Sequence, residues 1–186
     1  MSKGNGESCI SRRSFLALGA GAAAATLFAD PVEAAIHAMP ERSLMLYNTH
    51  TGEQLRTTYW ASGRYLPESI ASASRLLRDH RSGDVHRMDP RVLDLMAAVQ
   101  RKLGTKGPIH IISGYRSPAT NAWLASISDG VACNSLHMQG KAVDIRVPGR
   151  SVREVGRAAM SLKAGGVGIY PASGFVHVDT GRVRRW

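Results

Sequence analysis

The chain has 186 residues and a formal net charge of +10, with 44% hydrophobic and 20% charged residues. Domains commonly contain about 100–200 residues, so this length predicts one compact domain with a short additional segment. The sequence contains no GxGxxG or phosphate-loop motif, which disfavours nucleotide chemistry. Its arginines are scattered and are not interleaved with aromatic residues, which disfavours binding to nucleic acid.

The first 34 residues have the pattern of a twin-arginine export signal. Arg12 and Arg13 precede an Ala/Gly-rich apolar stretch over residues 17–29, and small residues around Ala34 suit a signal peptidase. A membrane anchor is the alternative, but the stretch is shorter than the ~20 residues that span a bilayer. We therefore expect cleavage after Ala34, a single domain over residues 35–186, and a monomer in the periplasm or cell envelope without a stable membrane anchor.

The positive charge belongs to the predicted mature domain, because residues 1–34 contain as many basic as acidic side chains. Outside the cytoplasm, a basic domain has the anionic cell-wall polymer and phospholipid head groups as available partners. We interpret most of the basic residues, including the group at 182–185, as solvated surface. Arg116 is the exception, because it lies in a loop that follows a predicted strand.

The first half of the predicted domain combines a hairpin with two helices. Strands over residues 43–48 and 53–60 flank a turn at Gly52, and apolar residues at helical spacing predict a helix over 67–81. A second helix begins with Asp89 as its N-cap and Pro90 at its first position, and it ends before Gly104.

The second half predicts further strands that carry polar side chains. Residues 108–113 form a strand that leads into a loop over 114–118, followed by a short helix over 119–126 and a polar loop over 127–136. In a strand over 141–147, Asp144 lies on the face opposite Val143 and Ile145. A helix over 152–162 and a hairpin of 167–170 with 175–179 complete the chain. This order predicts an α+β fold with an antiparallel central sheet flanked by helices.

His137, Asp144 and His177 form a candidate zinc set of two imidazoles and one carboxylate. Three such ligands leave a coordination position open for water, as in hydrolytic zinc sites, whereas structural zinc sites are usually closed by four ligands. On one helix, residues 137 and 144 would lie about 10 Å apart, so only a turn at Gly140 followed by a strand can bring them together. A His and an Asp at this spacing also occur as hydrogen-bonded structural residues, so the spacing alone leaves both interpretations open.

Four segments carry a resemblance to a known family, at residues 113–118, 134–145, 165–170 and 175–181. Together they resemble the M15-type zinc peptidases, in the branch typified by murein endopeptidase K, over roughly residues 40–186. The resemblance implies a hedgehog/DD-peptidase-like fold with one Zn²⁺ ion. It also implies hydrolysis of amide bonds in peptidoglycan peptide cross-links. The implied zinc ligands are His137, Asp144 and His177, and Arg116 corresponds to an arginine beside the scissile carbonyl.

The general base of the family is missing at its usual positions. Many M15 peptidases have Glu or Asp three residues before the last zinc histidine, and related enzymes instead have His two residues before it; these positions are Gly174 and Phe175 here. Asp179 shares the strand face of His177 and is a candidate base or a partner that orients an imidazole. His110 is a second candidate, with a core histidine as its alternative interpretation.

The same site suits two other functions. A zinc carboxypeptidase would remove a terminal D-amino acid from wall peptides, and a non-catalytic zinc module would only bind peptidoglycan. The sequence leaves open which cross-link an endopeptidase would cut.

Overall fold

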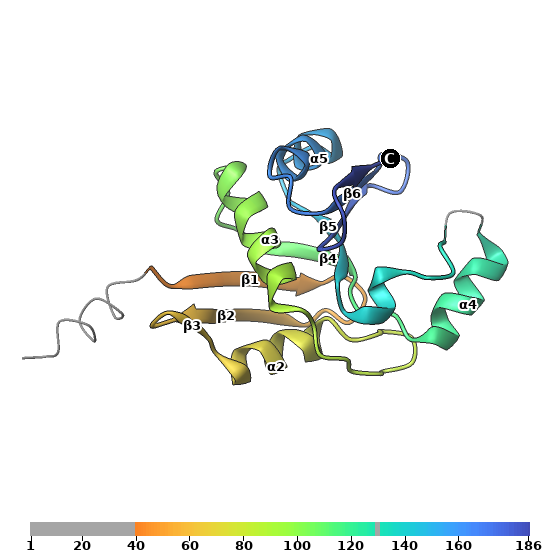
Figure 1. The fold of residues 1–186 in the computed structure, drawn as a ribbon, viewed down its shortest axis with the longest axis horizontal. Helices are drawn as coiled ribbons and strands as arrows, with labels where there is room; N and C mark the ends of the chain where they lie inside the picture. Colours follow the sequence, from red (N-terminus) through yellow and green to blue (C-terminus); the bar gives the residue numbers. More distant parts are fainter. Residues whose placement is uncertain (1–39, 129–130) are drawn as a thin grey trace, which may run out of the picture.

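A computed structural model describes residues 40–128 and 131–186, so the predicted export signal lies outside the described residues. Within this part of the chain the fold is α+β, as predicted, and Figure 1 shows helices packed against a twisted sheet. The strands are β1 (Arg42–Asn48), β2 (Gln54–Ala61), β3 (Arg64–Tyr65), β4 (Ile109–Ser113), β5 (Ala142–Arg146), β6 (Gly166–Tyr170), β7 (Phe175–Asp179) and β8 (Arg184–Arg185). The helices are α2 (Pro67–Leu76), α3 (Pro90–Lys102), α4 (Pro118–Ile127), α5 (Val152–Ser161) and the 3₁₀ helix η1 (Leu136–Gln139).

The described strands form one eight-stranded sheet in the order β3-β2-β1-β4-β5-β7-β6-β8. The prediction of an antiparallel sheet is wrong at two places, since β1 pairs with β4 and β6 pairs with β8 in parallel. A parallel pair needs a long crossover, and the segment that contains α2 and α3 provides it between β1 and β4. The short strand β8 was not predicted.

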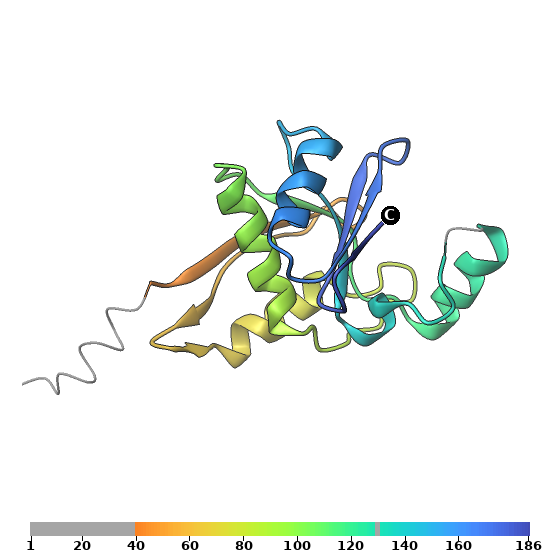
Figure 2. The ribbon, with the colours of Figure 1, turned by 45° about the horizontal axis from the view of Figure 1, so that its top comes forward.

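Helices α2, α3 and α5 pack against the sheet, as the two views in Figures 1 and 2 show. The core contains Val143 and Ile145 of β5 and Val176 and Val178 of β7, all of them buried. Because successive side chains of a strand point to opposite faces, the residues between these valines and isoleucines face away from this core. Helix α4 projects from the rest of the domain in both views.

The predicted helix over 67–81 is shorter in the structure. It ends at Leu76, because the carbonyl of Leu77 accepts a hydrogen bond from the backbone N–H of Tyr115 and the carboxylate of Asp79 accepts one from the N–H of Arg81. The helix predicted after Asp89 is confirmed as α3, and the Asp89 side chain accepts from the N–H of Arg91. Among the described residues, no helix combines the length and apolar character that a membrane span requires.

Candidate metal centre

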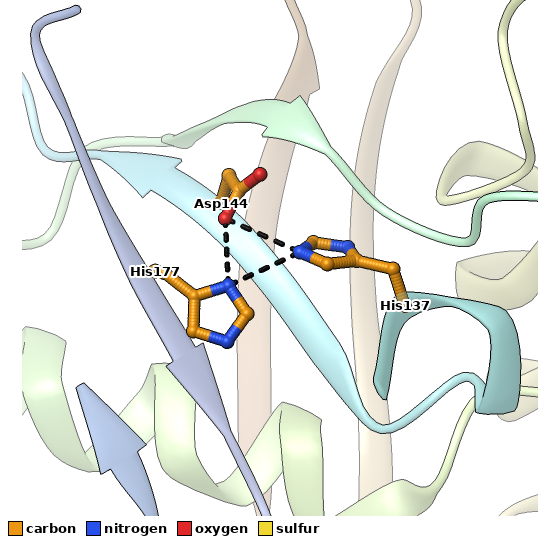
Figure 3. Close-up of side chains that lie close together, drawn as sticks. All are labelled: His137, Asp144 and His177. Atoms are coloured by element: carbon orange, nitrogen blue, oxygen red, sulfur yellow. Dashed lines mark hydrogen bonds and ion pairs between the residues drawn. The ribbon is translucent and has the colours of Figure 1, made fainter. Parts of the chain in front are cut away.

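His137, Asp144 and His177 converge at one point on the sheet, as Figure 3 shows. His137 Nε2 lies 3.1 Å from His177 Nδ1 and 3.3 Å from Asp144 Oδ1, and His177 Nδ1 lies 2.9 Å from the same oxygen. All three residues are buried. The sequence therefore identified three residues that the fold brings into direct contact.

Backbone pairing explains how residues far apart in the sequence meet. Asp144 on β5 lies directly opposite His177 on β7 in an antiparallel register, so both side chains leave the same face of the sheet. His137 comes from η1, which is followed by Gly140 with a φ of +64°. This left-handed conformation suits glycine and lets the chain turn from η1 into β5.

The other ring nitrogen of His137 is held by the backbone of the loop after β4. His137 Nδ1 lies 2.6 Å from the carbonyl oxygen of Gly114, which can only accept a hydrogen bond. Nδ1 therefore carries a proton, and Nε2 is the atom that faces Asp144 and His177. Gly114 itself packs against the backbone of Leu77, where a Cβ atom would overlap the Leu77 carbonyl.

Asp179 holds His177 in the same way. Its Oδ2 lies 3.0 Å from His177 Nε2, on the opposite side of the ring from the nitrogen that faces Asp144. The carboxylate also accepts hydrogen bonds from Arg184 and from the backbone N–H groups of Gly166 and Gly181. Burial alone would raise the pKa of Asp179, but these hydrogen bonds hold it well below its ordinary value. A carboxylate that orients an imidazole is a recurrent feature of metal sites.

The electrostatics of the three ligands suit a cation. Burial alone would raise the pKa of Asp144, but the charge and hydrogen bonds of His137 and His177 hold it below its ordinary value. Burial would lower the pKa of His177, yet its hydrogen bonds with Asp144 and Asp179 raise it. Asp144 is thus held in its charged form, and His177 attracts a proton, the usual competitor of a metal ion.

The donor set also fits zinc in geometry. A tetrahedral zinc ion with bonds of about 2.1 Å has ligand atoms roughly 3.4 Å apart. The three contacts between the ligand atoms, from 2.9 to 3.3 Å, come close to this spacing. Two imidazoles and one carboxylate are also the ligand types that zinc accepts. Within the described residues, these three form the group that can hold a metal ion.

Arg116 lies beside this group. Its Nη2 is 3.7 Å from Asp144 Oδ2, and its Nη1 donates to Asn121 Oδ1 at 3.2 Å. Burial lowers the pKa of Arg116, and the charge of Asp144 partly offsets this effect. The buried Nε has no hydrogen-bond partner among the described residues, an arrangement that is costly and uncommon outside functional sites.

A pocket of about 670 Å³ opens over the centre. Its lining includes Arg116, His137, Asp144 and His177, together with residues of the loop after α4 and of the β6–β7 hairpin. His110 is absent from this lining; its ring lies 4.9 Å from that of Tyr47, and burial and Arg146 lower its pKa. The structure thus brings Arg116 and Asp179 to the candidate metal ligands and leaves His110 apart from them.

The sequence matches the family described as "Peptidoglycan L,D-endopeptidase MepK", a branch of the M15 peptidases, over residues 36–186. The chain belongs to this family. It is 40% identical to the Escherichia coli K12 protein named "Peptidoglycan L,D-endopeptidase MepK", covering 94% of this chain and 96% of that protein. It is 39% identical to the Haemophilus influenzae protein named "Probable peptidoglycan L,D-endopeptidase MepK", covering 94% and 95% of the two chains. The family resemblance drawn from the four sequence segments is therefore confirmed.

The C-terminal residues also contribute to the site, which the sequence interpretation missed. Arg184 was interpreted as solvated surface, and this is wrong: it is half-buried and donates to both oxygens of Asp179, at 3.0 and 2.7 Å. Trp186 lines the pocket, with its ring centroid 5.3 Å from that of His177. The sequence contains one indication of this contribution, which is the dense run of arginines before Trp186.

Proposed function

We propose that this protein is a zinc-dependent L,D-endopeptidase that hydrolyses amide bonds in the peptide cross-links of peptidoglycan. The observation that carries the proposal is the buried His137–Asp144–His177 group at the base of a pocket, in a chain of the MepK family. The relatives are named L,D-endopeptidases, which supports an amide between an L-centre and a D-centre as the bond that is cut.

We assign different roles to the residues of this centre, namely metal binding and the orientation of the metal-binding imidazoles. His137, Asp144 and His177 would hold the zinc ion, which when bound lowers the pKa of a water to about 7 and polarises the substrate carbonyl. Gly114 and Asp179 keep the two imidazoles in the tautomers whose free lone pairs face that ion. We propose that Asp179 is a positioning residue and not the general base, since its carboxylate is 0% exposed and enclosed by donors.

Arg116 would stabilise the reacting carbonyl. Its guanidinium lines the pocket and is anchored by Asn121, so it is preorganised before substrate arrives. Negative charge develops on the carbonyl oxygen as water attacks, and a fixed cation beside it lowers the barrier. The ion pair with Asp144 at 3.7 Å is long enough to leave guanidinium N–H groups free for the substrate.

We also propose the export signal, the domain organisation and the localisation that the sequence predicts. Residues 1–34 act as a cleaved twin-arginine signal, and residues 35–186 form a single monomeric zinc peptidase domain of the hedgehog/DD-peptidase type in the periplasm or cell envelope. The excess positive charge of this domain favours its accumulation on the anionic wall polymer.

The test is incubation of purified cross-linked muropeptide dimers with the protein, followed by mass spectrometry. We expect conversion of dimers into monomers, loss of this activity with a chelator, and its return with added zinc. The variant His137→Ala should be inactive under all three conditions, so unchanged turnover by this variant would refute the proposal. Loss of single residues from the dimer would identify a carboxypeptidase instead, and binding without cleavage would identify a non-catalytic module.

A further inference from the structure

Three aromatic residues line the pocket next to the candidate metal ligands: Tyr170, Phe175 and Trp186. In the β6–β7 hairpin, Tyr170 pairs with Phe175 and Gly168 pairs with His177. Directly paired residues share a face of the sheet, and residues two apart on a strand do as well. Tyr170 therefore projects from the same face as His177, two pairs further along the hairpin.

Trp186 fixes the direction of the Tyr170 hydroxyl. The indole Nε1–H of Trp186 donates to Tyr170 Oη at 2.6 Å, and an indole nitrogen can only donate. The phenol oxygen must therefore accept in this contact, which leaves its own hydrogen available for another partner. Among residues 40–128 and 131–186, no acceptor receives that hydrogen.

The two rings are themselves held in place. The ring of Tyr170 stacks on Phe175 with centroids 4.7 Å apart and planes 24° apart. Trp186 packs over Gly168, where a Cβ atom would lie 2.6 Å from the indole, and its backbone bonds to Val167 and Ile169 of β6. A phenol that is already ordered loses less entropy when it binds a transition state than a phenol that must first be oriented.

The Trp186 ring is tied to the support of the metal ligand. The guanidinium of Arg184 lies 4.8 Å from the indole centroid, and the same group binds both oxygens of Asp179. Asp179 in turn contacts His177. The C-terminal segment thus connects one metal ligand to the Tyr170 hydroxyl through direct contacts.

Tyr170 and Arg116 line the same pocket as Asp144 and His177. Tyr170 is also among the groups that influence the pKa of Arg116, which agrees with their being near neighbours across this pocket. A carbonyl bound at the metal centre would therefore have a cation and a hydroxyl donor within the same cavity.

We propose that Tyr170 is a catalytic residue that donates a hydrogen bond to the carbonyl oxygen as that oxygen gains negative charge, and that Trp186 is a positioning residue that directs this donor. The inference rests on the proposed endopeptidase function. Tyr170 keeps its proton throughout, so the hydrogen bond strengthens as charge develops and no group is transferred. Such a donor acts mainly on the transition state and only weakly on the bound substrate.

The test uses full-length mature protein loaded with zinc and a cross-linked muropeptide dimer. Tyr170→Phe removes the hydroxyl and keeps the stack on Phe175, so we expect kcat to fall by about 100-fold, the loss typical of an oxyanion donor, with KM little changed. A phosphinate analogue of the cross-link should bind this variant more weakly by the same factor as the loss in kcat/KM. Zinc content should match the unmodified protein. Tyr47→Phe, on β1, is the matched control and should retain full activity.

Trp186→Phe tests the positioning role. It keeps an aromatic ring over Gly168 but removes the N–H donor, so we expect a smaller fall in kcat than for Tyr170→Phe, with KM again unchanged. The double variant should be no worse than Tyr170→Phe alone, because Trp186 acts through the phenol. Independent losses that multiply in the double variant would overturn the positioning role.

The catalytic role of Tyr170 is overturned if Tyr170→Phe keeps kcat within about twofold, or if only KM rises, which would indicate a ground-state contact. These results require that the unmodified protein cleaves the dimer. Absence of any cleavage by the unmodified protein contradicts the proposed function itself, so the two failures are distinguishable.

Discussion

Asp179→Asn tests how much the metal centre depends on the residues behind it. The carboxylate accepts at Oδ1 from Gly166, Gly181 and Arg184, and at Oδ2 from His177 and Arg184. Asparagine has the same shape but carries two N–H donors in place of one oxygen. In either flip of the amide, its NH₂ group faces donors of the protein, and the positive charge of Arg184 loses its partner.

The magnitude follows from these contacts. Breaking a buried ion pair by removing one partner costs about 3–5 kcal/mol, and Asp179 is fully buried. Loss of a carboxylate that orients a metal-bound imidazole typically lowers metal affinity by about 10–100-fold. We therefore expect Asp179→Asn to lose about 3–5 kcal/mol of unfolding free energy and at least tenfold in zinc affinity.

The assays are urea unfolding of the metal-free protein and zinc competition with a chromophoric chelator. Asp84→Asn is the matched control, because this exposed carboxylate accepts from Ser82 at the surface, and it should change neither quantity. If Asp179→Asn keeps zinc affinity within twofold and stability within about 1 kcal/mol, the assignment of Asp179 as a positioning residue is wrong.

Three further predictions concern the surroundings of the centre. Arg116→Met should lower kcat by about 10²–10³-fold while zinc content, measured by mass spectrometry, stays at one ion per chain. Gly114→Ala should lower both zinc affinity and thermal stability, because its Cβ overlaps the Leu77 carbonyl and displaces the oxygen that holds His137; retention of both would contradict this. Asp79→Asn should make unfolding less dependent on pH in acid. Burial alone would raise the pKa of Asp79, but hydrogen bonds from Thr120, Ser117 and Arg81 hold it well below its ordinary value. The stabilisation by Asp79 is therefore complete above the unfolded pKa of about 4 and is lost as pH falls through the folded pKa. The stability difference between the two proteins should shrink below pH 4, and a constant difference would refute the assignment.

The sequence predicted that the candidate metal ligands meet, because Asp144 and His177 lie on strands and His137 lies next to a predicted turn. Alternation along residues 141–147 separates Asp144 from Val143 and Ile145, and the structure has this arrangement. The segment around Gly140 predicts a turn, and it forms η1 and a left-handed glycine. In these places local geometry determines where a side chain points, so the sequence alone was sufficient.

The remaining contacts depend on long-range pairing that no local pattern contains. The two-residue strand β8 exists because residues 184–185 pair with β6, and this pairing brings Arg184 to Asp179 and Trp186 to Tyr170. Similarly, apolar spacing extends the predicted helix to residue 81. In the structure, the Asp79 carboxylate accepts hydrogen bonds from the backbone N–H groups of Arg81 and Ser117 instead. Tertiary hydrogen bonds override helical periodicity there.

A zinc titration of the metal-free protein, with cleavage of a cross-linked muropeptide dimer measured at each step, tests whether the three residues form the reactive centre. If His137, Asp144 and His177 form the reactive centre, the rate should rise from zero and reach a plateau at one zinc per chain, and Asp144→Ala should show no rise. Cleavage by the metal-free protein, or an undiminished rise in Asp144→Ala, would contradict the assignment of this centre.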